Sequence, residues 1–197
     1  MKTFRSRQDF WNWQIQKLLK GDMLNASGLS RDEFTDHLGL LKGAFLNSDG
    51  ERDMIIVPPS IVSLTAKMRL VTLKRKRGYC YIRPWEIQKE ILTPANFYLA
   101  LDVEDGQKML GKSADRCVEL FHQKRRSELV ANEGAMIAYY WPEVLLDRNI
   151  DLPGSRHGAD LVADLWLNEG RPELSWDGSG NSHSGWGSAS CGSRVGL

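Results

Sequence analysis

Two copies of one tripeptide, Gly154-Ser155-Arg156 and Gly192-Ser193-Arg194, combine residue types that can bind an anion. Glycines let consecutive backbone N–H groups turn inward as an anion-binding nest, and a serine hydroxyl adds a donor. Each arginine adds a planar fork that fits a carboxylate or a phosphate. If the chain folds back so that the copies meet, their two guanidinium groups flank one pocket.

The second copy closes a stretch, residues 176–194, that is rich in glycine and serine but also holds two tryptophans. Polar and aromatic residues in this stretch would complete such a pocket. We therefore predict that loops 153–158 and 176–194 bind a small anionic or polar ligand, or a protein partner. The predicted ligand-binding residues are Ser155, Arg156, Asn181, His183, Trp186 and Arg194.

Two structural alternatives compete with this site. In the first, Trp176 and Trp186 fill the core from a surface loop while Arg194 bonds backbone carbonyls. In the second, which composition alone suggests, the glycine- and serine-rich stretch is a disordered tail. The sequence leaves all three alternatives open.

An enzymatic alternative makes Cys191 a nucleophile with His183 as its base, because a nest would also serve as an oxyanion hole. Such a thiolate needs nearby positive charge, which Arg194 would supply. A serine nucleophile at Ser155 lacks the following glycine of a nucleophile elbow. No pair of cysteines or histidines has zinc-ligand spacing, so we predict no metal and no cofactor.

A basic run, Lys74-Arg-Lys-Arg77, precedes Tyr79 and Tyr81 and suggests a third function, nucleic-acid binding by phosphate contacts and base stacking. The competing interpretation is a solvated hairpin tip between strands 69–73 and 79–83, turned at Gly78. The formal net charge of the chain is only +1. That balance favours the hairpin tip and argues against nucleic acid as a partner.

Composition places the chain among globular proteins of one domain, or of one domain with a small appendage. It has 197 residues, and 42% of them are apolar, which is enough for a sizeable core. Its three cysteines, at wide spacings, indicate a reducing compartment rather than a disulfide framework. No stretch is apolar enough for a signal peptide or a spanning helix, so we expect a cytoplasmic protein with no membrane partner. The oligomeric state stays open.

Helical signals dominate the first quarter of the chain. Apolar residues over 8–20 fall on one half of a helical wheel, with Trp13 off the stripe. Ser30 and Glu33 have capping-box spacing at the start of a second helix. The turn-forming cluster 47–50 then predicts a boundary between a two-helix arm, 1–48, and a domain, 49–197.

The domain carries a mixture of strand and helix signals. Strands are expected at 54–57, 97–103, 161–167 and 172–176, and residues 60–71 fit either a helix or a strand. Helical turns are expected over 84–92 and 143–147, with longer helices after Ser113 and over 131–141. These elements predict an α+β fold: a mostly antiparallel sheet, helices packed largely on one face, and the N-terminal helical arm.

Five segments of the chain, in this order, carry a resemblance to a known family: Leu101-Asp-Val-Glu-Asp-Gly, Asn132-Glu-Gly, Trp141-Pro-Glu-Val-Leu, Ile150-Asp-Leu-Pro-Gly-Ser-Arg and Trp186-Gly-Ser-Ala-Ser-Cys-Gly-Ser-Arg. The chain resembles a family of bacterial proteins of about this length that is classed as a domain of unknown function. The resemblance covers roughly residues 54–194 and implies no activity or substrate. The family pattern has a histidine ahead of the proline at 142, where this chain has Tyr139-Tyr140. Any role for that histidine is therefore absent here.

Overall fold

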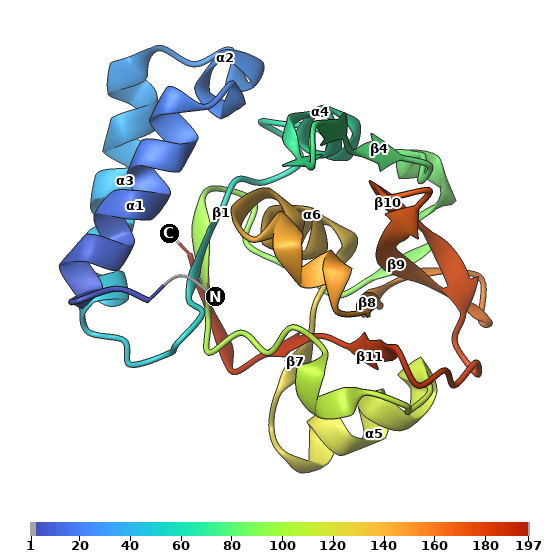
Figure 1. Ribbon diagram of the computed structural model, residues 1–197. Coiled ribbons are helices and arrows are strands. Elements are labelled where there is room, and N and C mark those ends of the chain that lie inside the picture. The colour runs from blue at the N-terminus through green and yellow to red at the C-terminus, as the bar shows by residue number, and fades with distance from the viewer. Residues whose placement is uncertain (1–2, 197) are drawn as a thin grey trace.

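The computed structural model describes residues 3–196 and begins with three helices, of which the first and third lie side by side and the short second lies at one end of that pair (Figure 1). These are α1 (Arg7–Lys20), α2 (Met23–Ser27) and α3 (Arg31–Leu46). The capping box of Ser30 and Glu33 is confirmed at the start of α3, because each side chain accepts from the backbone N–H of the other. Helix α2 is an additional element, which the sequence analysis did not predict.

Six strands form the largest sheet. Its order is β11 (Trp186–Ser188), β8 (Asn149–His157), β9 (Leu161–Asn168), β10 (Arg171–Gly178) and β4 (Tyr79–Cys80), while β5 (Lys89–Glu90) pairs with β8. A second sheet has β6 (Tyr98–Leu101) between β1 (Met54–Ile56) and β13 (Ser193–Gly196). Two small pairs join β2 (Thr72–Leu73) to β3 (Lys76–Arg77) and β7 (Ser127–Glu128) to β12 (Ser190–Cys191).

Helix α6 (Ala131–Tyr140) lies at the centre of the molecule, and every one of its residues is buried (Figure 1). It packs against α4 (Leu64–Leu70) and against β8 and β9. Gly134 allows this approach, because a Cβ at that position would overlap the side chain of Leu152. Helix α5 (Ala114–Gln123) packs against β8 and β11. The α+β class and the mostly antiparallel pairing are therefore confirmed.

The N-terminal helices share one apolar core with the sheets. Phe10 of α1 contacts Phe45 of α3 and Trp141, with ring centroids 5.3 and 6.3 Å apart. Gln14, which is fully buried, donates to the carbonyl of Asp53 at 2.7 Å and accepts from the N–H of Ile55 at 2.9 Å. It thereby satisfies backbone groups beside the edge strand β1. The division at 1–48 and 49–197 stays a prediction.

The two stretches predicted as ligand-binding loops are largely β-structure, which corrects the sequence analysis. Residues 153–157 belong to β8, where the register shifts between Leu152 and Arg156. After β10, the rest of the stretch 176–194 forms three more strands. Strand β11 pairs parallel with β8, β12 pairs with β7, and the start of β13 pairs with β6. Glycine and serine suit these strands because small residues allow close backbone approach; a Cβ on Gly154 would lie 2.7 Å from the carbonyl oxygen of Leu129.

The basic hairpin also differs from the prediction. Strands β2 and β3 meet at Lys74 and Arg75, whose φ values are 46° and 68°, as a type I′ turn requires. Gly78 follows the hairpin instead of turning it. The ambiguous stretch 60–71 is resolved as α4, capped by Ser63, and residues 84–92 form one 3-10 turn, Pro84–Glu86, followed by β5. The helical turn expected at 143–147 is likewise a 3-10 helix, Pro142–Leu146.

No helix within residues 3–196 is long and apolar enough to cross a membrane.

Candidate functional site

The first Gly-Ser-Arg segment is tied to its surroundings by specific bonds. Ser155 is fully buried, accepts from the N–H of Ala131 at 2.8 Å and donates to the carboxylate of Glu90. It thereby satisfies one free N–H at the start of α6. Arg156 forms an ion pair with Asp115 at 2.9 Å and donates to the carbonyl of Ala159 at 3.1 Å.

The second segment belongs to a different network. Arg194 bonds Glu133 twice, with both N–O distances 2.7 Å. It also donates to Ser127 Oγ and to the carbonyl of Glu128, each at 2.7 Å. Glu133 is fully buried and reaches back to the N–H of Val130, so this arginine neutralises the capping carboxylate of α6.

The two arginines thus have separate carboxylate partners rather than one open pocket between them. A cavity of about 310 Å³ is lined by Arg156, Glu90 and His122, among others, but not by Arg194. The sequence-based expectation of a shared pocket assumed two guanidinium groups available for a ligand. Their ion pairs remove that reason, and a role for these residues in ligand binding stays a prediction.

The other predicted residues of this site lie together at one turn. Asn181 Nδ2 donates to Asp177 Oδ1 at 3.2 Å, and the rings of His183 and Trp186 are 6.0 Å apart. Asn181 and His183 are exposed, while Trp186 begins β11. The structure therefore places Asn181 and His183 on the turn between β10 and β11, with the His183 ring beside Trp186 at the start of β11.

The thiol of Cys191 is fully buried in β12. Burial raises its pKa to about 12, with the charge of Glu133 acting in the same direction. A buried thiol with a raised pKa is a poor nucleophile at neutral pH. Cys80 is also buried, and burial raises its pKa to about 11.

We expect Cys191 in the folded protein to react with iodoacetamide near neutral pH no faster than Cys80. Timed alkylation followed by peptide mass spectrometry measures both rates in one sample, and unfolding in urea should accelerate both. Selective labelling of Cys191 in the native protein would revive the thiol-dependent alternative.

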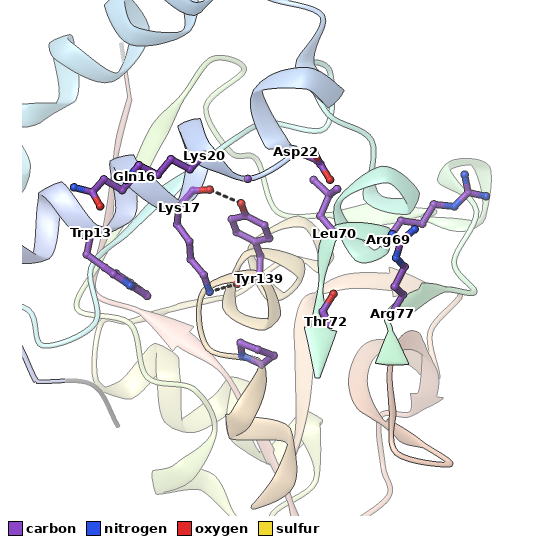
Figure 2. A pocket seen from close by; sticks show the side chains of 12 residues that line it. Trp13, Gln16, Lys17, Lys20, Asp22, Arg69, Leu70, Thr72, Arg77 and Tyr139 are labelled. Carbon is purple, nitrogen blue, oxygen red and sulfur yellow. Dashed lines mark hydrogen bonds between the residues drawn. The ribbon is translucent and has the colours of Figure 1, made fainter. Parts of the chain in front are cut away.

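A larger cavity, of about 640 Å³, lies between the N-terminal helices and the body of the protein (Figure 2). Side chains of α1 line one side of it, and those of α4 and β3 line the opposite side. Tyr139, from the last turn of α6, lies between them. The lining residues are Trp13, Gln16, Lys17, Lys20, Gly21, Asp22, Arg69, Leu70, Thr72, Arg77, Tyr139 and Pro142.

Reciprocal hydrogen bonds join the α1 side of this cavity to the end of α6. Lys17 Nζ donates to the carbonyls of Tyr139 and Tyr140, each at 2.7 Å, and the hydroxyl of Tyr139 donates to the carbonyl of Lys17 at 2.7 Å. A cation suits this place, because the last carbonyls of a helix lack partners within the helix and carry its negative dipole end. Gly21 leaves room for the tyrosine hydroxyl, which a Cβ would overlap.

Positive charge predominates around the cavity, where Lys17, Lys20, Arg69 and Arg77 face a single acid, Asp22. Within the described residues, the side chains of Lys20, Arg69 and Arg77 form no ion pair or hydrogen bond. Trp13 and Tyr139 add aromatic surface, each with its ring centroid 5.4 Å from Lys17 Nζ. Such a cavity can accept the anionic group of a ligand and contact its apolar part.

Sequence reasoning did not find this cavity. Its residues come from six separate elements, and the sequence analysis singled out Trp13, the run containing Arg77 and Tyr139 for unrelated reasons. One local signal was available: Trp13, Lys17 and Lys20 recur at helical spacing on a side of α1 that its apolar stripe does not use.

A second feature missed from sequence is a row of polar side chains across four strands. Ser188, Asp151, Asp164 and Ser175 occupy successive partner positions on β11, β8, β9 and β10. The two carboxylates are only 4% and 1% exposed, and each accepts from its serine neighbour, at 3.3 and 2.8 Å. The sequence signal for this row was Asp164, an acidic residue inside the otherwise apolar run 161–167.

Burial is the main influence on the pKa values of these two carboxyl groups. It raises the pKa of Asp151 to about 6, with Asp177 adding repulsion. It raises the pKa of Asp164 to about 8, against the opposing effect of the Ser175 hydrogen bond and with repulsion from Asp151. Asp164 therefore carries a proton near neutral pH. No group of three acids, histidines or cysteines suited to a metal occurs in residues 3–196.

Comparison with known proteins adds one relationship. No curated protein and no solved structure matches the chain significantly. A family described only as a family of unknown function, DUF5701, matches residues 17–197, from the last turn of α1 onward. The match extends the resemblance that the sequence motifs suggested into the N-terminal helices and includes every cationic residue of the large cavity. The chain therefore belongs to the DUF5701 family of unknown function.

Proposed function

We propose that this protein binds a small anionic ligand in the cavity between α1, α4, β3 and the end of α6. One observation carries the proposal: three cationic side chains, Lys20, Arg69 and Arg77, line the cavity with no ion pair or hydrogen bond to a described residue. Cations gathered at a concave surface without carboxylate partners attract an anion.

The shape and composition of the cavity favour a particular class of ligand. Its volume, about 640 Å³, lies in the range of small-molecule sites. Arginine forks bind phosphate or carboxylate oxygens in pairs, and Trp13 and Tyr139 offer ring surface beside them. A phosphate- or carboxylate-bearing molecule with a flat apolar portion fits both features.

The walls of the cavity come from elements that meet only in the folded protein. Lys20 ends α1, whereas Arg69 and Arg77 belong to α4 and β3. The Lys17 and Tyr139 bonds fix α1 against the end of α6, and α6 in turn packs against α4. This supports a site that is formed before the ligand arrives, which lowers the ordering cost of binding.

The test is isothermal titration with inorganic pyrophosphate, followed by thermal-shift screening of phosphorylated and carboxylated nucleosides and sugars. We expect Arg69→Ala to weaken pyrophosphate binding by about tenfold or more, since a hydrogen bond to a charged group contributes roughly 1.5–3 kcal/mol. Lys20→Ala should act in the same direction, with a smaller effect.

Lys42→Ala is the matched control, because Lys42 is an exposed cation on α3 that does not line this cavity. Its pyrophosphate affinity should equal that of the unmodified protein. Equal weakening by Lys42→Ala and Arg69→Ala would point to general charge attraction and contradict a site in the cavity.

A further inference from the structure

A second surface, residues 77–85, exposes aromatic rings beside cations. Tyr79, Tyr81 and Trp85 are 44%, 62% and 74% exposed, and they make up half of the large apolar or aromatic side chains exposed in residues 3–196. Scattered single exposures are ordinary, whereas several together on one segment mark an interaction surface. We call residues 77–85 the aromatic edge.

Within the aromatic edge, residues 77–83 alternate regularly between exposed and buried. Cys80 and Ile82 are buried at 8% and 1%, so Arg77, Tyr79, Tyr81 and Arg83 project toward solvent at every second position. In extended chain, alternate residues lie roughly 6.6–6.8 Å apart on one face. The pattern therefore sets two rings in sequence between two guanidinium groups.

This segment lies at the margin of the main sheet. Strand β4 pairs with β10 on one side and is the last strand of its sheet. Residues 79–86, with Thr65 of α4, line a concave surface of about 510 Å³. A flexible chain can thus lie along the edge without displacing any element of the fold.

Cations accompany the rings along the whole segment. The guanidinium of Arg171 lies 4.7 Å from the ring centroid of Tyr79, and that of Arg83 lies 5.6 Å from Trp85. The hairpin tip adds Lys74 and Arg75, both exposed. Arg171 also pairs with Glu173 at 3.5 Å, so Lys74 and Arg75 at the hairpin tip carry the charge that an anion would meet. A ligand that contacted only these charges would leave the rings without partners.

We infer that the aromatic edge binds single-stranded nucleic acid, with bases stacked on Tyr81 and Trp85 and phosphates beside the hairpin tip. Aromatic side chains alternating with cations suit a strand whose bases are unpaired and whose backbone is anionic. A duplex keeps its bases stacked internally and would leave these rings unused. Arg77 borders both surfaces, but the stacking rings Tyr81 and Trp85 do not line the cavity, so the inference does not depend on the ligand of the cavity.

The sequence alone favoured a solvated hairpin, since one basic run in a nearly neutral chain carries little weight. The structure adds the exposure of three rings and brings Arg171, which is remote in sequence, onto Tyr79. These two observations favour nucleic-acid binding over a hairpin that is only solvated.

Fluorescence anisotropy with a labelled oligothymidine at low salt tests the inference. The double change Tyr81→Ala with Trp85→Ala is expected to weaken binding by at least about 30-fold, because stacking contributes roughly 1–3 kcal/mol per base. Changing Lys74 and Arg75 to alanine should reduce the slope of log affinity against log salt by about 1.4. The same sequence as a duplex should bind more weakly.

Leu40→Ala with Leu92→Ala is the matched control, since both leucines are exposed, at 64% and 95%, and lie outside the aromatic edge. It should leave the affinity unchanged, and circular dichroism should show intact folding for each variant. Failure to bind oligothymidine, or equal affinity of the ring variant and the unmodified protein, overturns the inference. So does equal affinity for the duplex, which would indicate a purely electrostatic surface. A cavity variant such as Lys20→Ala should still bind the oligonucleotide, so the two proposals fail separately.

Discussion

Replacing Arg194 with methionine is expected to destabilise the fold by about 3–5 kcal/mol. The side chain of Glu133 has no exposed surface, and Arg194 provides its only ion pair in the described residues. Removing the guanidinium leaves a buried carboxylate without its counter-charge. The change also releases Ser127 and the carbonyl of Glu128, which anchor β7.

Urea denaturation followed by circular dichroism measures this loss. Arg116→Met is the matched control: Arg116 pairs with Glu119 on the exposed side of α5, and such a pair contributes less than about 1 kcal/mol. The double change Glu133→Gln with Arg194→Met should be less destabilised than Arg194→Met alone, because no charge then stays buried. A stability of Arg194→Met equal to that of the control would show that the buried pair is not needed.

Replacing Asp164 with asparagine is expected to stabilise the protein at alkaline pH. The carboxyl pKa is about 8 in the folded protein against 3.8 for an unperturbed aspartate. Between these values the folded state holds a proton that the unfolded state has released, so stability falls as the pH rises through this window. Since one unit of pKa difference corresponds to about 1.4 kcal/mol, the loss amounts to several kcal/mol.

Asparagine cannot ionise and still accepts the Ser175 hydrogen bond, so the variant should lose less stability than the unmodified protein between about pH 4 and about pH 8. Asp151, with a pKa of about 6, acts in the same direction over the lower part of the window. Lys67 has the opposite effect on stability. Burial lowers the pKa of its ammonium group to about 7, so the stability that this group contributes rises as the pH increases from about 7 toward the unperturbed pKa of 10.5. Asp151 and Lys67 are present in both the variant and the unmodified protein. The difference in stability between the two proteins therefore reports mainly the ionisation of Asp164.

Chemical denaturation at a series of pH values provides the measurement, with Asp160→Asn as a control on the exposed turn between β8 and β9. The control should follow the unmodified protein at every pH. Identical pH profiles for all three proteins would contradict a protonated Asp164.

Features fixed by neighbouring residues were predicted well. The capping box of α3, the apolar stripe of α1 and the Ser113 cap of α5 all depend on contacts within a few residues, and the structure has each of them. The β9–β10 hairpin was also predicted, because its strands and connecting turn are adjacent in sequence. The α+β class follows from these local signals.

The candidate sites depended on contacts that no local pattern encodes. The Gly-Ser-Arg repeat identified two arginines, but the partner of Arg194 lies 61 residues away and that of Arg156 lies 41 residues away. The same repeat looked like loop because glycine and serine favour turns, whereas pairing with β8 and β6 makes much of that stretch strand.

By itself, then, the sequence determined the amphipathic helix α1, the capped helices α3 and α5, the long β9–β10 hairpin and which residues carry charge. Only the tertiary structure decided which charges are neutralised: it buried Arg194 against Glu133 and left Lys20, Arg69 and Arg77 around a cavity. The physical reason is that helix caps and strand periodicity act over a few residues. The pairing or exposure of a charge depends instead on which distant elements the core brings together.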